Sequence, residues 1–325
     1  MLLAEVGAEG QRRLLKGRAL VVGCGALGTH ASSFLVRAGV GEVTVVDRDI
    51  VELTNLQRQS LFSEKDLGRP KAKVAEQYLR EINSEVTVRG DVRDVNETNI
   101  QTMVRDATVV LDATDNMETR FLVNDACVKH GVPWIYAGAV ATTGMTMNIV
   151  PGGPCLRCLF KSLPQPGRLP TCDTVGIVNT LPAAVASFEA TEAFKIMLGK
   201  EPARGLVVID VWGTEIQRIE VKKDPDCVCC GKRDFEYLRA AKRKLAVSMC
   251  GRNAVQIVPS RRLEGSLEEL GTRLSRLGKT TLLDGVLRFE GHDVDLVVFP
   301  DGRTIVSGTT DVSKAKAVFS KFIGD

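Results

Sequence analysis

A glycine-rich segment near the start of the chain has the spacing of a nucleotide-binding loop. Gly23, Gly25 and Gly28 form a GxGxxG pattern in "VVGCGALG", between an expected strand and an expected helix. Glycines allow the backbone to approach a nucleotide closely, and the following helix N-terminus offers N–H groups to its phosphates. Asp47 ends the next expected strand, where a carboxylate accepts hydrogen bonds from ribose hydroxyls. The pattern predicts nucleotide binding but does not distinguish NAD from ATP.

Four polar side chains after this strand indicate which nucleotide is bound. Asn55, Arg58 and Gln59 lie in "TNLQRQ", and Lys71 lies at the start of an expected helix. ATP carries more negative charge than NAD, and a reaction at its α-phosphate must stabilise departing pyrophosphate. Arginine offers a forked contact to phosphate and lysine a point charge, while amides contact the remaining oxygens. We expect the set to bind ATP, although Gln59 taken alone is explained by surface polarity.

An acidic residue follows another expected strand. Asp115 lies in "LDATDN", at the edge of the sheet where ligands bind, and a carboxylate there suits Mg²⁺. The alternative is that Asp115 caps the helix that begins in "NMETRF". The three histidines, His30, His130 and His292, occur in unrelated contexts. A histidine acting as general base is therefore not expected.

Cysteines form two pairs that are typical of a metal site. The chain has nine cysteines, and their local clustering without an export signal favours metal or thiol chemistry over disulfides. Cys155 with Cys158 and Cys227 with Cys230 give two CxxC motifs. Four thiolates suit a closed tetrahedral zinc site that is structural rather than catalytic. Cys229 complicates the register, but only Cys227 with Cys230 repeats the spacing of the first pair.

The remaining cysteines fall into two groups. Cys172 lies in a separate segment after the Pro-rich "LPQPGRLPT", and its thiol is either catalytic or dispensable. Its reactivity depends on a pKa that the sequence does not reveal. Cys24, Cys127 and Cys250 are expected to be packing residues.

The elements that position these residues alternate between strand and helix. Such alternation predicts an α/β fold with a parallel, doubly wound, Rossmann-like sheet. Two expected strands, 205–211 and 214–221, follow the last helix of the main domain. One expected helix of this domain directly follows the Gly-rich loop. The other expected helices cover residues 70–83, 96–105, 116–130 and 181–198.

The domain organisation follows from length and pattern. A chain of 325 residues is expected to form two domains, because one core rarely exceeds roughly 250–300 residues. We expect the catalytic domain over residues 1–232, a basic linker helix over 233–247 and a small α+β accessory domain over 248–325. In the last segment the pattern is strand, helix, three short strands and a final helix. Docking or regulation is the role expected for it.

Composition excludes several classes of protein. Hydrophobic residues make up 44% and charged residues 26%, which is ordinary for a globular protein. A net charge of +3 is too small to argue for a nucleic-acid or membrane partner. We see no signal peptide and no run of 18 apolar residues, so a cytoplasmic location is expected.

The sequence resembles the MoeB/ThiF/HesA activating enzymes, relatives of ubiquitin-activating enzymes, over about residues 2–232. The matching segments occur in order: "VVGCGALG", "VVDRDIVELTNLQRQ", "GRPKA", "LDATDN", "PCLRC", "TCDTVGIVNTLPAAVAS" and "DCVCCG". In such enzymes ATP adenylates the C-terminal glycine carboxylate of a ubiquitin-like protein. The resemblance implies that Asp47 binds ribose, that Asn55, Arg58 and Lys71 hold the triphosphate, and that Asp115 supports Mg²⁺.

The resemblance also implies partners. These are a ubiquitin-like sulfur carrier protein of the ThiS or MoaD type that ends in Gly-Gly, a second copy of the chain in a homodimer, and a sulfur donor protein. Cys172 matches the cysteine that in some members links covalently to the carrier or carries sulfur. Family members usually begin with a "RYxRQ"-like segment whose arginine reaches the partner's ATP site. Arg12 and Arg13 do not match it, and without such a cation we expect a lower rate.

Three other functions are compatible with parts of the pattern. The chain could activate a modifier for protein conjugation through a Cys172 thioester. An NAD dehydrogenase would share the Gly-rich loop, but the "NLQRQ" segment, Lys71 and the cysteine pairs argue against it. A nucleotide-binding module without catalytic activity is the third alternative. Relatives that cyclise a tRNA nucleoside share the fold but usually lack the cysteine pairs.

Overall fold

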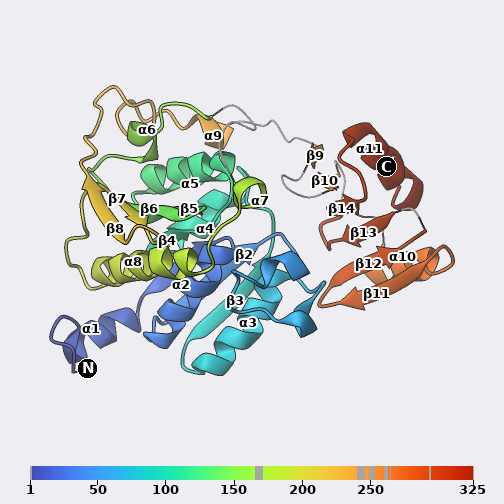
Figure 1. The fold of residues 1–325 in the computed structure, drawn as a ribbon, viewed down its shortest axis with the longest axis horizontal. Coiled ribbons are helices and arrows are strands. Elements are labelled where there is room, and N and C mark those ends of the chain that lie inside the picture. The colour runs from blue at the N-terminus through green and yellow to red at the C-terminus, as the bar shows by residue number, and fades with distance from the viewer. Residues whose placement is uncertain are drawn as a thin grey trace. The chain divides into compact units, whose positions relative to one another are not determined.

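The computed structural model describes residues 2–164, 171–239, 246–248, 253–259, 263, 265–292 and 294–324. Contacts divide the chain into two compact units, Met1–Ala240 and Ala241–Asp325. Each unit contains one sheet with its own helices (Figure 1). The domain boundaries expected from the sequence, after residues 232 and 247, stay predictions.

The first unit is built on a mixed eight-stranded sheet in the order β3-β2-β1-β4-β5-β6-β7-β8. The strands from β3 to β5 run parallel, whereas β6, β7 and β8 pair antiparallel. Their bounds are β1 (Arg18–Val22), β2 (Glu42–Asp47), β3 (Thr87–Val92), β4 (Val109–Asp112), β5 (Trp134–Val140), β6 (Thr143–Ile149), β7 (Leu206–Asp210) and β8 (Glu215–Ile219).

The expectation of a parallel sheet is confirmed for β1 to β5 and is wrong for β6, β7 and β8. A tight turn at Ala141, whose φ is 52°, joins β5 to β6 directly. So short a connection can join only antiparallel strands, because parallel strands need a crossover.

Helices cover both faces of this sheet (Figure 1). Alternate strand residues point to opposite faces, so Val21 joins the core under one set of helices and Leu20 and Val22 join the other. On the first face lie α2 (Ala26–Arg37), α3 (Lys71–Ile82) and α8 (Thr180–Met197). On the second lie α4 (Ile100–Arg105) and α5 (Met117–His130).

Shorter helices complete the unit. An N-terminal helix, α1 (Gly7–Leu14), packs near the end of α8, where Arg13 donates to the Leu198 carbonyl at 2.8 Å. The others are η1 (Leu53–Asn55), η2 (Glu64–Asp66), α6 (Leu156–Leu159), α7 (Cys172–Val175) and α9 (Glu236–Arg239). The expected basic linker helix is described only over α9, because residues 240–245 lie outside the described part of the chain.

The second unit is an α+β fold around an antiparallel six-stranded sheet in the order β11-β12-β13-β14-β10-β9. Two helices, α10 (Leu267–Leu274) and α11 (Val312–Phe322), supply apolar side chains to its core. The strands are β9 (Ala246–Ser248), β10 (Ala254–Ile257), β11 (Lys279–Leu283), β12 (Val286–Glu290), β13 (Asp295–Val298) and β14 (Thr304–Ser307).

The sequence pattern predicted three strands between these helices, and the structure has four. Asp284 and Gly285 both have positive φ values, 50° and 76°, so they form a tight hairpin turn between β11 and β12. Within the part of the chain that the structure describes, no helix is long and apolar enough to span a membrane.

Candidate active site

The residues predicted to bind a nucleotide gather where β1, β2 and β4 end. β1 lies between β2 and β4 in the sheet, so the chain leaves β1 in one direction and later returns on its other side. The crevice at such a switch point is where parallel α/β sheets bind ligands. The Gly-rich loop follows β1, Asp47 ends β2, and Asp115 follows β4.

The three glycines of the loop have different surroundings. Gly23 has a φ of +99°, and a Cβ atom there would lie 2.4 Å from the Ala113 carbonyl oxygen. A Cβ atom on Gly28 would lie 2.1 Å from the Gly23 carbonyl oxygen. Chain packing therefore explains both. At Gly25, directly before α2, the nearest atom would be Gln59 Nε2 at 3.8 Å. Gly25 thus leaves space over a helix N-terminus, as an approaching phosphate requires.

Asp47 holds this loop in place. One carboxylate oxygen accepts from the Cys24 backbone N–H at 2.6 Å, and the other accepts from the Asp49 N–H at 2.6 Å. Burial raises the pKa of Asp47, and the charge of Lys71 opposes this shift. Each carboxylate oxygen can accept a further bond. Asp47 can therefore bind a ribose hydroxyl while it orders the loop.

The polar set after β2 divides by position. Lys71 and Gln59 are both 3% exposed, and Lys71 Nζ lies 3.6 Å from an Asp49 carboxylate oxygen. Gln59 Oε1 has no hydrogen-bond partner among the described residues, although it is buried. An unpartnered buried amide oxygen fits a site that a ligand hydroxyl or other donor completes, while the amide nitrogen of the same side chain is the atom nearest to the open Gly25 position.

The other two members of the set have local contacts. Asn55 is buried, and its side-chain oxygen accepts from the Glu52 N–H at 3.3 Å, which builds the 3₁₀ turn η1. Arg58 Nη1 donates to the Thr54 carbonyl at 3.0 Å on the same turn. Direct contact of Asn55 and Arg58 with phosphate stays a prediction.

Asp115 is exposed at the end of β4. The alternative role as helix cap belongs instead to Asn116, whose side-chain oxygen accepts from the Thr119 N–H at 2.8 Å at the start of α5. The amide of Asn116 also donates to Asp115 Oδ1 at 3.2 Å. A solvent-facing carboxylate at the ligand edge fits a Mg²⁺ ligand.

Sequence reasoning missed a cation beside this carboxylate. Arg48 pairs with Asp94 at 3.0 Å. Burial would lower the pKa of Arg48, but the charges of Asp94, Asp49 and Asp115 raise it above its ordinary value. The signal was visible, because Arg48 directly follows Asp47 in "VVDRD". Arg12 and Arg13, in contrast, bond within α1 and to the end of α8.

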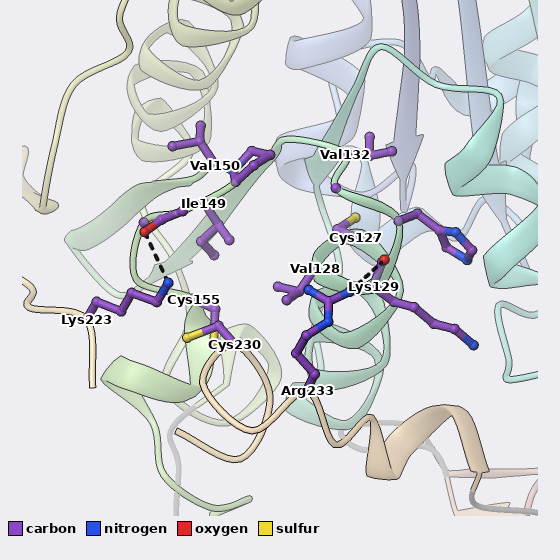
Figure 2. A pocket seen from close by; sticks show the side chains of 15 residues that line it. Cys127, Val128, Lys129, Val132, Ile149, Val150, Cys155, Lys223, Cys230 and Arg233 are labelled. Atoms are coloured by element: carbon purple, nitrogen blue, oxygen red, sulfur yellow. Dashed lines mark hydrogen bonds between the residues drawn. The ribbon is translucent and has the colours of Figure 1, made fainter. Parts of the chain in front are cut away.

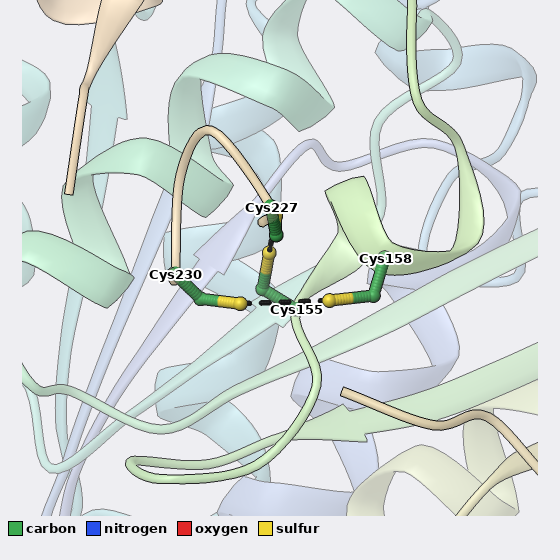
Figure 3. A group of neighbouring side chains, drawn as sticks. All are labelled: Cys155, Cys158, Cys227 and Cys230. Carbon is green, nitrogen blue, oxygen red and sulfur yellow. Dashed lines mark hydrogen bonds between the residues drawn. The ribbon is translucent and has the colours of Figure 1, made fainter. Parts of the chain in front are cut away.

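The four paired cysteines converge, as expected (Figure 3). Their sulfur atoms all lie within 4.8 Å of one another. Cys155 and Cys227 approach to 3.6 Å, and Cys158 and Cys230 to 3.5 Å. A disulfide needs about 2.05 Å. Tetrahedral zinc with Zn–S bonds of about 2.3 Å places sulfurs about 3.8 Å apart. The cluster therefore fits a closed four-thiolate metal site.

The pKa values of the paired thiols and the contacts of Cys229 bear on this metal site. The hydrogen bond to Cys155, together with burial, raises the pKa of Cys158 to about 12. Burial and the bond from Cys158 raise the pKa of Cys230 to about 12. A metal that binds these thiols must therefore displace protons. Cys229 is not one of the four grouped thiols: its sulfur accepts from Asn124 Nδ2 at 3.2 Å and also interacts with Cys155.

Cys172 is separate from this cluster. It begins α7, is half-buried, and donates its thiol to the Ala139 carbonyl on β5 at 3.3 Å. Cys24 and Cys127 are fully buried, and burial raises the pKa of both thiols, as packing residues require. Cys250 lies outside the described residues.

A cavity of about 310 Å³ lies beside the cysteine cluster (Figure 2). Cys155 and Cys230 line it together with basic side chains. Lys223 donates to the Gly152 carbonyl at 3.2 Å, and Arg233 donates to the Lys129 carbonyl at 3.3 Å. The cavity borders the C-terminal end of α5. The edge of the sheet that holds the candidate nucleotide site borders the N-terminal end of α5. A 14-residue helix spans about 20 Å. The cavity is therefore distinct from the nucleotide site.

The fold and the site define an α/β protein with a candidate nucleotide site. Its four-cysteine cluster joins two segments that are distant in the sequence. Residues 1–229 match the ThiF family, and the chain belongs to that family. This finding confirms the resemblance seen in the sequence.

Named relatives agree with this assignment. The sulfur carrier protein ThiS adenylyltransferase of Bacillus subtilis (strain 168) is 43% identical in an alignment of 330 positions that covers 99% of this chain and 97% of that protein. The SAMP-activating enzyme E1 of Haloferax volcanii is 40% identical in an alignment of 248 positions that covers 74% of this chain and 92% of that protein. The crystal structure of E. coli MccB with MccA-N7isoASN matches with a TM-score of 0.62 at 26% identity, over 68% of this chain and 69% of that one.

Proposed function

We propose that this protein is an ATP- and Mg²⁺-dependent adenylyltransferase. Its substrate is the C-terminal glycine carboxylate of a ubiquitin-like sulfur carrier protein, and it serves sulfur transfer in thiamine or molybdenum cofactor synthesis. The observation that carries the proposal is the open Gly25 position, which has the donor amide nitrogen of Gln59 as its nearest atom, beside buried Lys71. Similarity to the ThiS adenylyltransferase over nearly the whole chain supports the choice of substrate.

The reaction needs positioning more than proton transfer. The carrier carboxylate attacks the α-phosphorus of ATP, the bond to the bridging oxygen breaks, and pyrophosphate leaves with the electron pair. A terminal carboxyl group has a pKa of about 3.5, so no base is required to ionise it. The barrier lies in bringing two anions together in line, which cations and fixed geometry lower.

Each residue then has one role. Asp47 binds ribose, Gly25 lets the phosphates approach α2, and Lys71, Gln59, Asn55 and Arg58 hold the triphosphate. Asp115 would hold Mg²⁺, and the ion would supply positive charge against the departing phosphates. Cys155, Cys158, Cys227 and Cys230 would hold Zn²⁺ as a structural ion. The partners are a carrier that ends in Gly-Gly, a second copy of the chain in a homodimer, and a sulfur donor protein.

Cys172 supports a second step, the transfer of the activated carrier to a thiol. Its half-buried sulfur at the start of α7 favours this role, whether it serves sulfur transfer or a thioester for conjugation. We expect Cys172→Ala to keep normal ATP–pyrophosphate exchange and to lose sulfur or thioester transfer. Full transfer by this variant, measured with purified carrier and sulfur donor, would exclude the role.

ATP–pyrophosphate exchange tests adenylation itself. We expect exchange only with Mg²⁺ and a carrier that ends in Gly-Gly, and we expect Asp115→Ala to lower it by about 100-fold or more. Exchange without any carrier, or undiminished exchange in the variant, would contradict the proposed roles. ATP binding without exchange with any carrier would favour a nucleotide-binding module without catalytic activity.

A further inference from the structure

A buried ion pair lies beneath the loop that carries Asp115. Asp112, the last residue of β4, pairs with Arg120 in α5 at 3.0 Å, and their side chains are only 2% and 12% exposed. Neither residue contacts solvent extensively, and neither has a role in the reaction described above. The pair therefore needs an explanation of its own.

The pair closes the loop between β4 and α5 into a fixed shape. Asp112 Oδ1 accepts from both the backbone N–H and the hydroxyl of Thr114, at 2.9 and 2.7 Å. Arg120 Nη2 donates to the Thr114 carbonyl at 2.7 Å. Thr114 is thus held through its backbone N–H, its hydroxyl and its carbonyl oxygen. The next residue is Asp115, so the direction in which its backbone leaves the loop is set by these bonds.

Arg120 also anchors the loop to the next strand. The same Nη2 donates to the Ala137 carbonyl on β5 at 2.9 Å, and the guanidinium lies 5.3 Å from the ring centre of Tyr136. Two residues further along β5, the Ala139 carbonyl accepts from the Cys172 thiol. One planar side chain therefore connects the Asp115 loop to the strand that supports Cys172.

Stability alone does not explain such a pair. Burying two charges carries a desolvation penalty, and well-packed apolar side chains in their place are often as stable. A guanidinium offers several donors in a rigid fork, which fixes geometry rather than adding stability. A loop that must aim one exposed carboxylate at a cation has a use for such rigidity.

We propose that Arg120, itself oriented by Asp112, is a positioning residue that holds Asp115 ready for the divalent cation of the bound nucleotide. The inference rests on the proposed function, because it requires Asp115 to ligate the cation. Arg120 does not touch the nucleotide. Its loss should therefore weaken cation binding more than it weakens nucleotide binding.

The test is Mn²⁺ binding, measured by electron paramagnetic resonance on the full chain with a non-hydrolysable ATP analogue. We expect Arg120→Gln to raise the Mn²⁺ dissociation constant about tenfold or more, as loss of a residue that orients a metal ligand typically does. Affinity for the analogue without metal should change less than about threefold. Arg120→Lys should retain part of the wild-type Mn²⁺ affinity, because lysine keeps the positive charge but not the forked set of donors.

Arg80 provides the matched control. Its guanidinium donates to the Val88 carbonyl on β3 at 3.2 and 3.0 Å, so it also ties a helix to a strand, but away from Asp115. Arg80→Gln should leave the Mn²⁺ affinity unchanged. If Arg120→Gln does not fold, Asp112→Asn, which removes the charge but keeps the size of the side chain, should show the same selective loss.

The outcomes separate this inference from the proposed function. The positioning role would be overturned if a folded Arg120→Gln or Asp112→Asn protein had unchanged Mn²⁺ affinity. It would also be overturned if Arg80→Gln lowered the Mn²⁺ affinity equally. Wild-type protein that binds no Mn²⁺ with the analogue would overturn it as well. Arg120-dependent Mn²⁺ binding without exchange in the presence of any carrier would support the inference while contradicting adenylation.

Discussion

Two glycines of the phosphate loop are required for different physical reasons. Gly28 is close-packed against the Gly23 carbonyl, whereas Gly25 has open space where a side chain would project. A substitution at Gly28 should therefore affect folding, and a substitution at Gly25 should affect the ligand. The sequence motif alone gives the two positions equal weight.

We expect Gly25→Ala to change the free energy of unfolding by less than about 0.5 kcal/mol. It should raise the ATP dissociation constant about tenfold, or about 1.4 kcal/mol, because the methyl group occupies the space of the phosphates. Denaturant unfolding and calorimetric titration measure the two quantities. Gly28→Ala is the control and should destabilise by roughly 1–3 kcal/mol. Normal ATP affinity in a folded Gly25→Ala protein would contradict the proposed binding mode.

Two buried glutamates on α8 have opposite surroundings. Glu192 accepts from Asn148 Nδ2 and from the Ala203 N–H, both at 2.7 Å. Glu189 is fully buried, and neither of its carboxylate oxygens has a hydrogen bond of ordinary geometry to the described residues, although the Asp112 backbone N–H lies near. Burial, together with the nearby charge of Asp112, raises the pKa of Glu189 well above its ordinary value.

This contrast predicts a pH effect on stability. Between the unfolded pKa, about 4.3, and the raised folded pKa, the folded state binds one more proton than the unfolded state at Glu189. Its contribution to stability therefore falls as pH rises, by about 1.4 kcal/mol per pH unit in that range. Glu189→Gln should remove this loss, so the variant should gain stability relative to wild type as the pH rises above about 5.

Urea unfolding across that pH range measures the difference, and Glu192→Gln is the control. That variant weakens the bonds from Asn148, Ala203 and Lys195 to a carboxylate and should destabilise by about 1–3 kcal/mol. A constant stability difference between wild type and Glu189→Gln at all pH values would contradict the prediction.

Residue types in the sequence predicted several residues that the fold brings together at the candidate site, and their roles stay predictions. The glycine spacing, Lys71 and Asp115 were recognisable because their chemistry and order along the chain are local signals. Arg120 was not, because its role depends on the Ala137 carbonyl, which only the folded sheet brings near. The helix cap was assigned to Asn116 only once the hydrogen bond to Thr119 was seen.

At the scale of elements, the parallel strands were the most predictable part of the fold. Strands β1 to β5 alternate with helices, and that alternation is visible in the sequence. The direction of β6 depends on a short turn at Ala141, a non-glycine residue with positive φ that no turn motif marks. The β11–β12 hairpin does carry an Asp-Gly signal at residues 284–285, but the sequence interpretation did not use it.

The cysteine cluster joins two distant segments of the first unit, the α6 turn and the turn at residues 227–230. We expect Cys227→Ala to lower the melting temperature of zinc-replete protein by roughly 5 °C or more, because structural zinc contributes free energy of folding directly. ATP affinity should change much less, because Cys155 and Cys227 belong to the core on the α5 face of the sheet, whereas Cys24 and Leu27 of the Gly-rich segment belong to the core on the opposite face.

Differential scanning calorimetry and metal analysis check this prediction. Cys172→Ala is the matched control, since it removes a thiol outside the cluster. Wild-type protein should contain one zinc per chain and the Cys227→Ala protein much less. An unchanged melting temperature in the Cys227→Ala protein would count against a structural metal.

At the scale of the whole molecule, the two units differ in which known proteins align with them. The ThiF family match covers residues 1–229 and so lies within the first unit. The Bacillus subtilis relative also aligns over the second unit, whereas the Haloferax volcanii relative aligns over 74% of this chain. Adenylation is therefore assigned to the first unit, and a docking or regulatory role for the second stays a prediction.

The most direct test of adenylation is the intact mass of the carrier after incubation with this protein, ATP and Mg²⁺. The account predicts that a ThiS-type carrier ending in Gly-Gly gains the mass of one adenylyl group. A carrier that lacks its last glycine should gain none, and neither should the intact carrier incubated with Asp115→Ala protein. The account would be contradicted if the carrier stayed unmodified although the wild-type protein binds ATP. Equal modification of the truncated carrier would contradict it as well.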